Sequence, residues 1–227
     1  MSFERTRALG MRHLEALLLL FVFACTCAEP RPDGTVVLDH QPEPTTEVGT
    51  NGEKPGDSPS NFVFGEYQGG RDLPLAATVE FEILDPRYRS QYGPSPYVSL
   101  KDPADDIRYM QAPNVRVVNS PNLTIVIDYP VTSEWSVTVR SSSPRGFTRS
   151  ELAQMVSDIY HRMYELEEQT SSIRVIPLDQ RRGLSNRNTT NGKFGIWGHD
   201  IDDLVLHSLD VRRTTDGDLI AFLGIDS

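Results

Sequence analysis

The sequence predicts an α+β domain in which an antiparallel sheet, built from hairpins, packs on one long amphipathic helix. Two pairs of apolar, β-branched segments are joined by short turns, and one segment between the pairs repeats its apolar residues with a helical period. No cysteine follows Cys27. The fold therefore depends on an apolar core, which about 165 residues are enough to supply.

The first strands are predicted from alternation. Residues 78–85, "TVEFEILD", place Val79, Phe81 and Ile83 on one face and glutamates on the other, which is typical of a half-buried strand. Residues 115–120 are a weaker strand candidate.

Residues 123–128 and 135–141 are rich in β-branched residues, and the short turn between them predicts an antiparallel hairpin. Trp135, Val137 and Val139 are expected to face the core.

A helix is predicted from residue 148 onward. Thr148 and Glu151 have the spacing of a capping box, and Phe147 and Leu152 that of a hydrophobic staple. The i, i+3, i+4 rhythm then predicts a buried stripe of Leu152, Met155, Val156, Ile159, Tyr160, Met163 and Tyr164. His161 and Glu165 lie off this stripe, so we interpret them as a solvated pair and not as metal ligands.

Beyond the helix, residues 173–178 form a strand candidate. Two further strands are predicted around Asp216-Gly217, because Asp-Gly between apolar runs favours a hairpin turn. An alternative interpretation makes residues 201–209 a short helix capped by Asp200.

The N-terminal residues 1–24 have the features of a signal peptide. Arginines at positions 5, 7 and 12 precede the apolar run Ala16–Ala24, which is shorter than the roughly 20 residues that a bilayer-spanning helix needs. Either Met1 or Met11 can serve as the start. The sequence therefore predicts an exported protein.

Residues Val22–Cys25, "VFAC", end this run and resemble the lipobox of bacterial lipoproteins, although Phe23 is bulkier than the pattern usually has. The resemblance implies cleavage before Cys25, a diacylglyceryl group on its thiol, and anchoring in the lipid bilayer of the cell membrane or outer membrane. Two alternatives remain open: cleavage after Cys27 or Ala28, which gives a secreted or periplasmic protein, and an uncleaved membrane anchor.

Residues 25–61 are rich in Pro, Glu, Thr and Gly, so a disordered, extended tether is expected before a domain at 62–227. The net charge of −10 makes nucleic acid a poor partner. The tyrosine- and proline-rich residues 85–113 are either a surface loop or a binding loop for a protein or peptide partner.

The stretch "NGKFGIWGHDIDDLVL" is the main candidate for chemistry. Its His199, Asp200, Asp202 and Asp203 offer nitrogen and oxygen ligands for a divalent metal, and together with Trp197 they offer a contact surface for a ligand. Only His199 and Asp203 are expected to be near neighbours in either a helix or a strand.

A purely structural interpretation competes with both of these roles. Gly195 and Gly198 permit tight turns around Phe194 and Trp197, which are expected to be buried, and Asp200 then accepts hydrogen bonds from turn amides. The preceding loop can balance the carboxylates through Arg181, Arg182 and Arg187.

These observations favour an envelope-anchored lipoprotein that acts as a non-enzymatic binding or structural module. No cofactor is predicted, because the chain has neither G-x-x-x-x-G-K-[ST] nor G-x-G-x-x-G, and G-x-S-x-G and H-E-x-x-H are also missing. The alternative is a metal-dependent or hydrolytic enzyme that uses His199 and Asp203 with Asp200 or Asp202.

Overall fold

The structure is a computed structural model that describes residues 62–84, 97–182 and 186–227. The predicted signal peptide, Cys25 and the tether to residue 61 lie outside the described residues, as do residues 85–96 of the tyrosine-rich loop. Within the described part, strands and two α-helices confirm the predicted α+β class.

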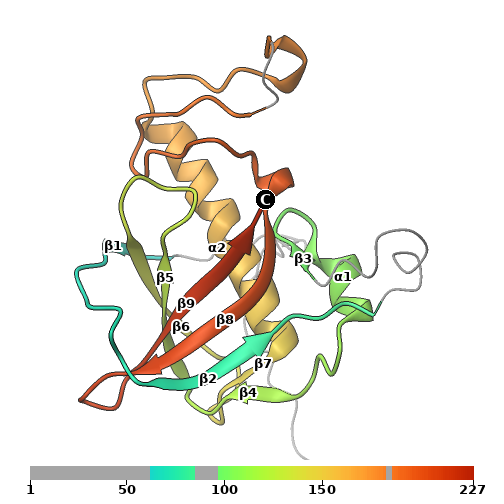
Figure 1. The fold of residues 1–227 in the computed structure, drawn as a ribbon, viewed down its shortest axis with the longest axis vertical. Helices are drawn as coiled ribbons and strands as arrows, with labels where there is room; N and C mark the ends of the chain where they lie inside the picture. The colour runs from blue at the N-terminus through green and yellow to red at the C-terminus, as the bar shows by residue number, and fades with distance from the viewer. Residues whose placement is uncertain (1–61, 85–96, 183–185) are drawn as a thin grey trace, which may run out of the picture. The chain divides into compact units, whose positions relative to one another are not determined.

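Most strands form one sheet, whose hydrogen-bonded order is β1-β6-β5-β9-β8-β2, with β3 also pairing with β8 (Figure 1). These strands are β1 (Phe64–Glu66), β2 (Leu75–Glu80), β3 (Val98–Ser99), β5 (Asn122–Ile127), β6 (Trp135–Arg140), β8 (Val205–Arg213) and β9 (Leu219–Asp226). A separate two-stranded ladder joins β4 (Arg116–Val118) to β7 (Phe147–Thr148).

Both predicted hairpins are present, since β5 pairs antiparallel with β6 and β8 pairs antiparallel with β9. The two hairpins meet through a parallel pair, in which Ile125 of β5 lies opposite Ala221 of β9. The sheet is therefore mixed, and the expectation of a purely antiparallel sheet is wrong at this pair. Turn residues set the direction of strands within each hairpin but not the direction in which two hairpins join.

The alternating pattern correctly identified the buried faces. Val79, Phe81 and Ile83 are buried, and so are the β6 residues Trp135 and Val137. The regular strand β2 ends at Glu80, although the Phe81 amide still donates to the carbonyl of His207 in β8.

Helix α2 (Arg149–Thr170) begins as predicted, with Thr148 as its N-cap and a complete capping box with Glu151. Its buried side chains share one hydrophobic cluster with residues of the sheet; those on the helix are Leu152, Ala153, Val156, Ile159, Tyr160, Met163 and Tyr164. Met155 is only partly buried. No helix in the described ranges is both long enough and apolar enough to cross a membrane.

A second, shorter helix, α1 (Pro103–Tyr109), lies inside the segment that was expected to be a long loop. Pro103 occupies its first turn, where the missing N–H has no helical partner to lose.

The strand predicted at residues 173–178 is absent, and this prediction is wrong. Ile173 and Ile176 are about half exposed, and their amides donate to the side chains of Asn191 and Asn188 and not to a neighbouring strand. Figure 1 shows this segment running past the C-terminal end of α2, away from the sheet. The asparagine side chains thus accept the backbone hydrogen bonds that the alternating apolar pattern predicted a neighbouring strand would accept.

The two interpretations of residues 201–209 each describe part of the structure. A single 3₁₀ turn, η3 (Ile201–Asp203), follows Asp200 as its N-cap, and strand β8 begins at Val205. A second 3₁₀ turn, η2 (Leu178–Gln180), precedes the segment that carries Arg181, Arg182 and Arg187, which we call the arginine-rich loop.

Candidate functional site

A buried carboxylate on helix α2 positions the candidate stretch. Glu167 is fully buried, and its two carboxylate oxygens accept hydrogen bonds from the backbone amides of Gly192, Phe194, Gly195 and Ile196 over 2.7–3.4 Å. The first residues of the stretch are therefore folded around one side chain of the helix.

Burial alone would raise the pKa of Glu167. The Thr190 hydroxyl and the amides of Phe194, Gly192 and Gly195 act against it, and the net result is a pKa below the ordinary value. Glu167 is thus an anion held by a cage of donors, which satisfies both the charge and the amides.

Sequence reasoning missed Glu167, although its position carried a signal. Residue 167 continues the helical register of Tyr160, Met163 and Tyr164 by one further turn, so it falls on the buried stripe. A glutamate in a core register is rarely buried without dedicated partners.

Two glycines shape the turns of the stretch, as expected. Gly195 has φ +63°, and an added Cβ there would collide with the Thr132 side chain. Gly198 has φ +75°. Side chains are strained in this region of backbone space, which explains glycine at both positions.

Trp197 is not buried as expected, since 37% of it is exposed. Its backbone amide donates to the carbonyl of Pro130 and its indole N–H to that of Val131, at 3.1 and 3.2 Å. Bonds to two successive carbonyls hold the ring along the surface of the β5–β6 connection, where its edge meets Tyr129 at a centroid distance of 5.2 Å. Phe194, by contrast, is buried.

Asp200 joins the stretch to the arginine-rich loop. Its carboxylate lies 2.6 Å from Nη1 of Arg181 and 3.8 Å from Nη1 of Arg187, and both guanidinium groups are almost completely buried. The hydrogen bond with Asp200 raises the pKa of Arg181. Two of the three arginines that were expected to balance the carboxylates therefore do so, whereas Arg182 is exposed.

The other members of the candidate group have separate partners. Asp202 forms an ion pair with Lys101, and the Asp203 carboxylate accepts a hydrogen bond from the Asp200 amide at 3.1 Å. The His199 ring lies 3.5 Å from the Ser227 hydroxyl, and its backbone carbonyl accepts a 2.8 Å hydrogen bond from the Tyr164 hydroxyl. Among the residues that the structure describes, no three histidine, cysteine or acidic side chains gather as metal ligands do.

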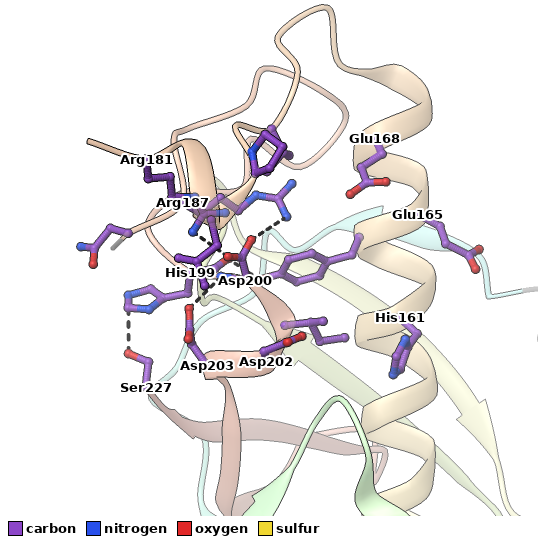
Figure 2. A pocket seen from close by; sticks show the side chains of 16 residues that line it. His161, Glu165, Glu168, Arg181, Arg187, His199, Asp200, Asp202, Asp203 and Ser227 are labelled. Atoms are coloured by element: carbon purple, nitrogen blue, oxygen red, sulfur yellow. Dashed lines mark hydrogen bonds and ion pairs between the residues drawn. The ribbon is translucent and has the colours of Figure 1, made fainter. Parts of the chain in front are cut away.

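An open pocket of about 840 Å³ lies between α2, the arginine-rich loop and η3. Figure 2 shows His161, Glu165 and Glu168 along the helix, with His199, the three aspartates and the two arginines on the segments opposite it. Pro177 and Leu178 add an apolar wall. The predicted site residues other than Trp197 thus line one cavity, which is a setting for recognition of a small or extended ligand.

Comparisons with protein-family models, with curated proteins and with solved structures found no match to this chain.

Proposed function

We propose that the protein is an envelope-anchored lipoprotein whose domain binds a ligand in the pocket beside α2. In this proposal Cys25 carries the acyl chains, residues 25–61 form the tether, and helix α2 supports both the sheet and the pocket. The observation that carries the binding role is the cavity of about 840 Å³, whose charged lining is held in place by contacts within the domain. Preorganised polar groups are typical of binding sites, because less ordering is needed when a ligand arrives.

The contacts of the aspartates favour binding over hydrolysis or metal chemistry. Asp200 is shared by two buried guanidinium groups, and Asp202 is paired with Lys101. The Asp203 side chain accepts a hydrogen bond from the Asp200 amide and so closes the turn at η3. Each carboxylate thus has a structural role that fixes the shape of the pocket.

The anchor is tested by intact-mass measurement of the membrane-extracted protein. We expect a mass that corresponds to a chain beginning at Cys25 with added acyl groups, and a Cys25→Ser protein that lacks them. Retention of residues 1–24, or an unmodified Cys25, would contradict the lipoprotein assignment.

The pocket is tested by adding a library of small charged and amphipathic fragments to the isotope-labelled protein and recording amide NMR shifts. We expect the shifts to concentrate at pocket residues such as Leu178, His199 and Asp203. The groove along Asn122 and Thr138 offers an internal comparison. A fragment response centred on that groove, or none at the pocket, would reject the proposed binding site.

A further inference from the structure

Arg187 has an unused pair of hydrogen-bond donors beside the pocket. Only 3% of its side chain is exposed, and its Nε and Nη2 have no hydrogen-bond partner within the described part of the chain. Buried guanidinium donors are normally paired, because leaving them unpaired costs free energy. Arg187 lines the same pocket as Asp200 and Asp203.

The guanidinium is held firmly by its other contacts. It lies over the Tyr164 ring, with 4.9 Å from Cζ to the ring centroid, and its Nη1 faces Asp200. The Arg187 amide also donates to the Gly198 carbonyl at 3.0 Å. These contacts fix the plane of the guanidinium and leave one edge, Nε–H with Nη2–H, without an acceptor.

That edge is a two-donor fork, and its natural partner is an oxyanion with two parallel oxygens. The nearest carboxylate does not fill this role, because Asp200 lies 3.8 Å from Nη1 and only 2.6 Å from Arg181. Asp200 therefore faces the charge of Arg187 on the Nη1 side, but it gives no acceptor to the Nε–H and Nη2–H edge.

The rest of the pocket is acidic and selects among oxyanions. Glu165 and Glu168 line it from α2, and Asp202 and Asp203 line it from η3. Glu165 is paired with Arg162 and Asp202 with Lys101, so Glu168 and Asp203 are the main sources of its net negative charge. This lining repels a multiply charged phosphate and attracts a cationic group. The donor edge of Arg187 and the acidic lining are together complementary only to a ligand that carries both an anionic and a cationic group.

We infer that the pocket binds a small zwitterionic ligand, whose carboxylate takes the Nε–H and Nη2–H fork of Arg187 and whose cationic group faces the acidic lining. This inference rests on the proposed binding function and names its ligand class. Both donors lie below the surface of the unliganded pocket, so side chains of the wall shift when the carboxylate enters.

The test follows the Nε–H signal of Arg187 in the isotope-labelled full chain, assigned through its contact with the Tyr164 ring. The probes are 6-aminohexanoate, acetate, n-butylammonium and inorganic phosphate. We expect 6-aminohexanoate to move the signal downfield and to bind at least tenfold more tightly than acetate. Butylammonium, which has no carboxylate, is expected to leave it in place.

Arg187→Lys keeps the charge but removes the fork, so we expect it to weaken 6-aminohexanoate binding at least tenfold. Arg182→Lys, in the same loop but exposed, is the matched control and should bind as the wild type does. If Arg187→Lys does not fold, the wild-type signal alone decides.

Three results would overturn the inference: an Arg187 signal that no probe moves, which indicates a structural guanidinium with a buried water only; tighter binding of phosphate than of 6-aminohexanoate; or unchanged binding by Arg187→Lys. If pocket amides respond to the fragment library but the Arg187 signal does not respond to 6-aminohexanoate, the ligand class is wrong and the binding function stands. If neither responds, both fail.

Discussion

Single residues determine the geometry of the pocket, and Glu167 has the widest influence. Its carboxylate accepts hydrogen bonds from the backbone amides of four residues in a five-residue segment. These bonds fix the conformation of that loop in place of a strand ladder. A glycine at 192 is required for this arrangement, because an added Cβ would lie 2.5 Å from the backbone carbonyl of Glu167 and 2.6 Å from its carboxylate.

Glu167→Gln should destabilise the fold by about 2 kcal/mol at neutral pH, since charge-assisted hydrogen bonds are lost and an amide N–H₂ faces other donors. Urea unfolding measures this difference. The neighbouring Glu168→Gln is the control, because that side chain is exposed and should leave the midpoint nearly unchanged.

The same variant has a defined pH dependence. The pKa of Glu167 is lower in the folded protein than its ordinary value of 4.5. Its contribution to the free energy of unfolding is therefore fully present above that value and is lost as the pH falls through the lowered pKa. The stability gap between wild type and Glu167→Gln should narrow below pH 4.5, and a gap that widens in acid would contradict the donor cage.

Asp200→Asn should be the most damaging of the three aspartate substitutions, because it leaves two buried guanidinium groups without their counter-charge. We expect its loss of thermal stability to be at least about twice that of Asp202→Asn, whose ion pair with Lys101 is exposed. Scanning calorimetry of the two variants, side by side, checks the order. Equal losses would show that the Asp200 contacts are not structural.

At the residue scale, the sequence identified the residues that line the pocket and the arginines that pair with Asp200. It did not predict the hydrogen bonds from backbone amides to Glu167. His199 and the aspartates were chosen for their residue types, and the structure places them along one cavity. The helical register of Glu167 indicates burial, but its amide partners lie about 25 residues later in the chain, and a long-range contact of this kind leaves no local pattern. The prediction for Trp197 was wrong because a large apolar ring favours burial, whereas its indole N–H donates to the Val131 carbonyl and the ring stays partly exposed.

Helices and strands were predicted correctly where a specific local motif marks their ends. The capping box set the start of α2, and Asp216-Gly217 set the β8–β9 turn, in which Gly217 has φ +94°. Alternation was weaker evidence, because residues 173–178 have the same apolar pattern as a strand but no neighbouring edge to pair with. Pairing is a tertiary event that a single segment does not encode.

Gly217→Ala tests the turn. An added Cβ meets nothing within 4 Å, so any loss of stability comes from the positive φ alone, at about 1 kcal/mol. Gly65 in β1 is the matched control: its Cβ position is equally open and its φ lies outside the positive range, so Gly65→Ala should cause little loss. Chemical denaturation of the pair separates backbone strain from packing.

At the scale of the whole domain, strand β9 decides whether the sheet is continuous. It is the last strand along the chain, yet it lies between β5 and β8 and joins the β1-β6-β5 half to the β8-β2 half. Its Ala221 and Phe222 are buried. In this mixed topology a central strand of the sheet is the last one along the chain. The sequence does not predict its central position, because the pattern of each hairpin is complete without the other.

A chain that stops after Arg213 should consequently fail to fold cooperatively, because both sheet halves lose their common neighbour and the core residues on β9. Removal of Ser227 alone is the control. It deletes a 2.9 Å hydrogen bond to the Tyr129 hydroxyl and the contact with His199, and it should keep the cooperative transition. Thermal unfolding followed by circular dichroism distinguishes the two. If the chain ending at Arg213 still melts sharply, the remaining strands form a stable sheet without β9, and the assigned role of the central strand is wrong.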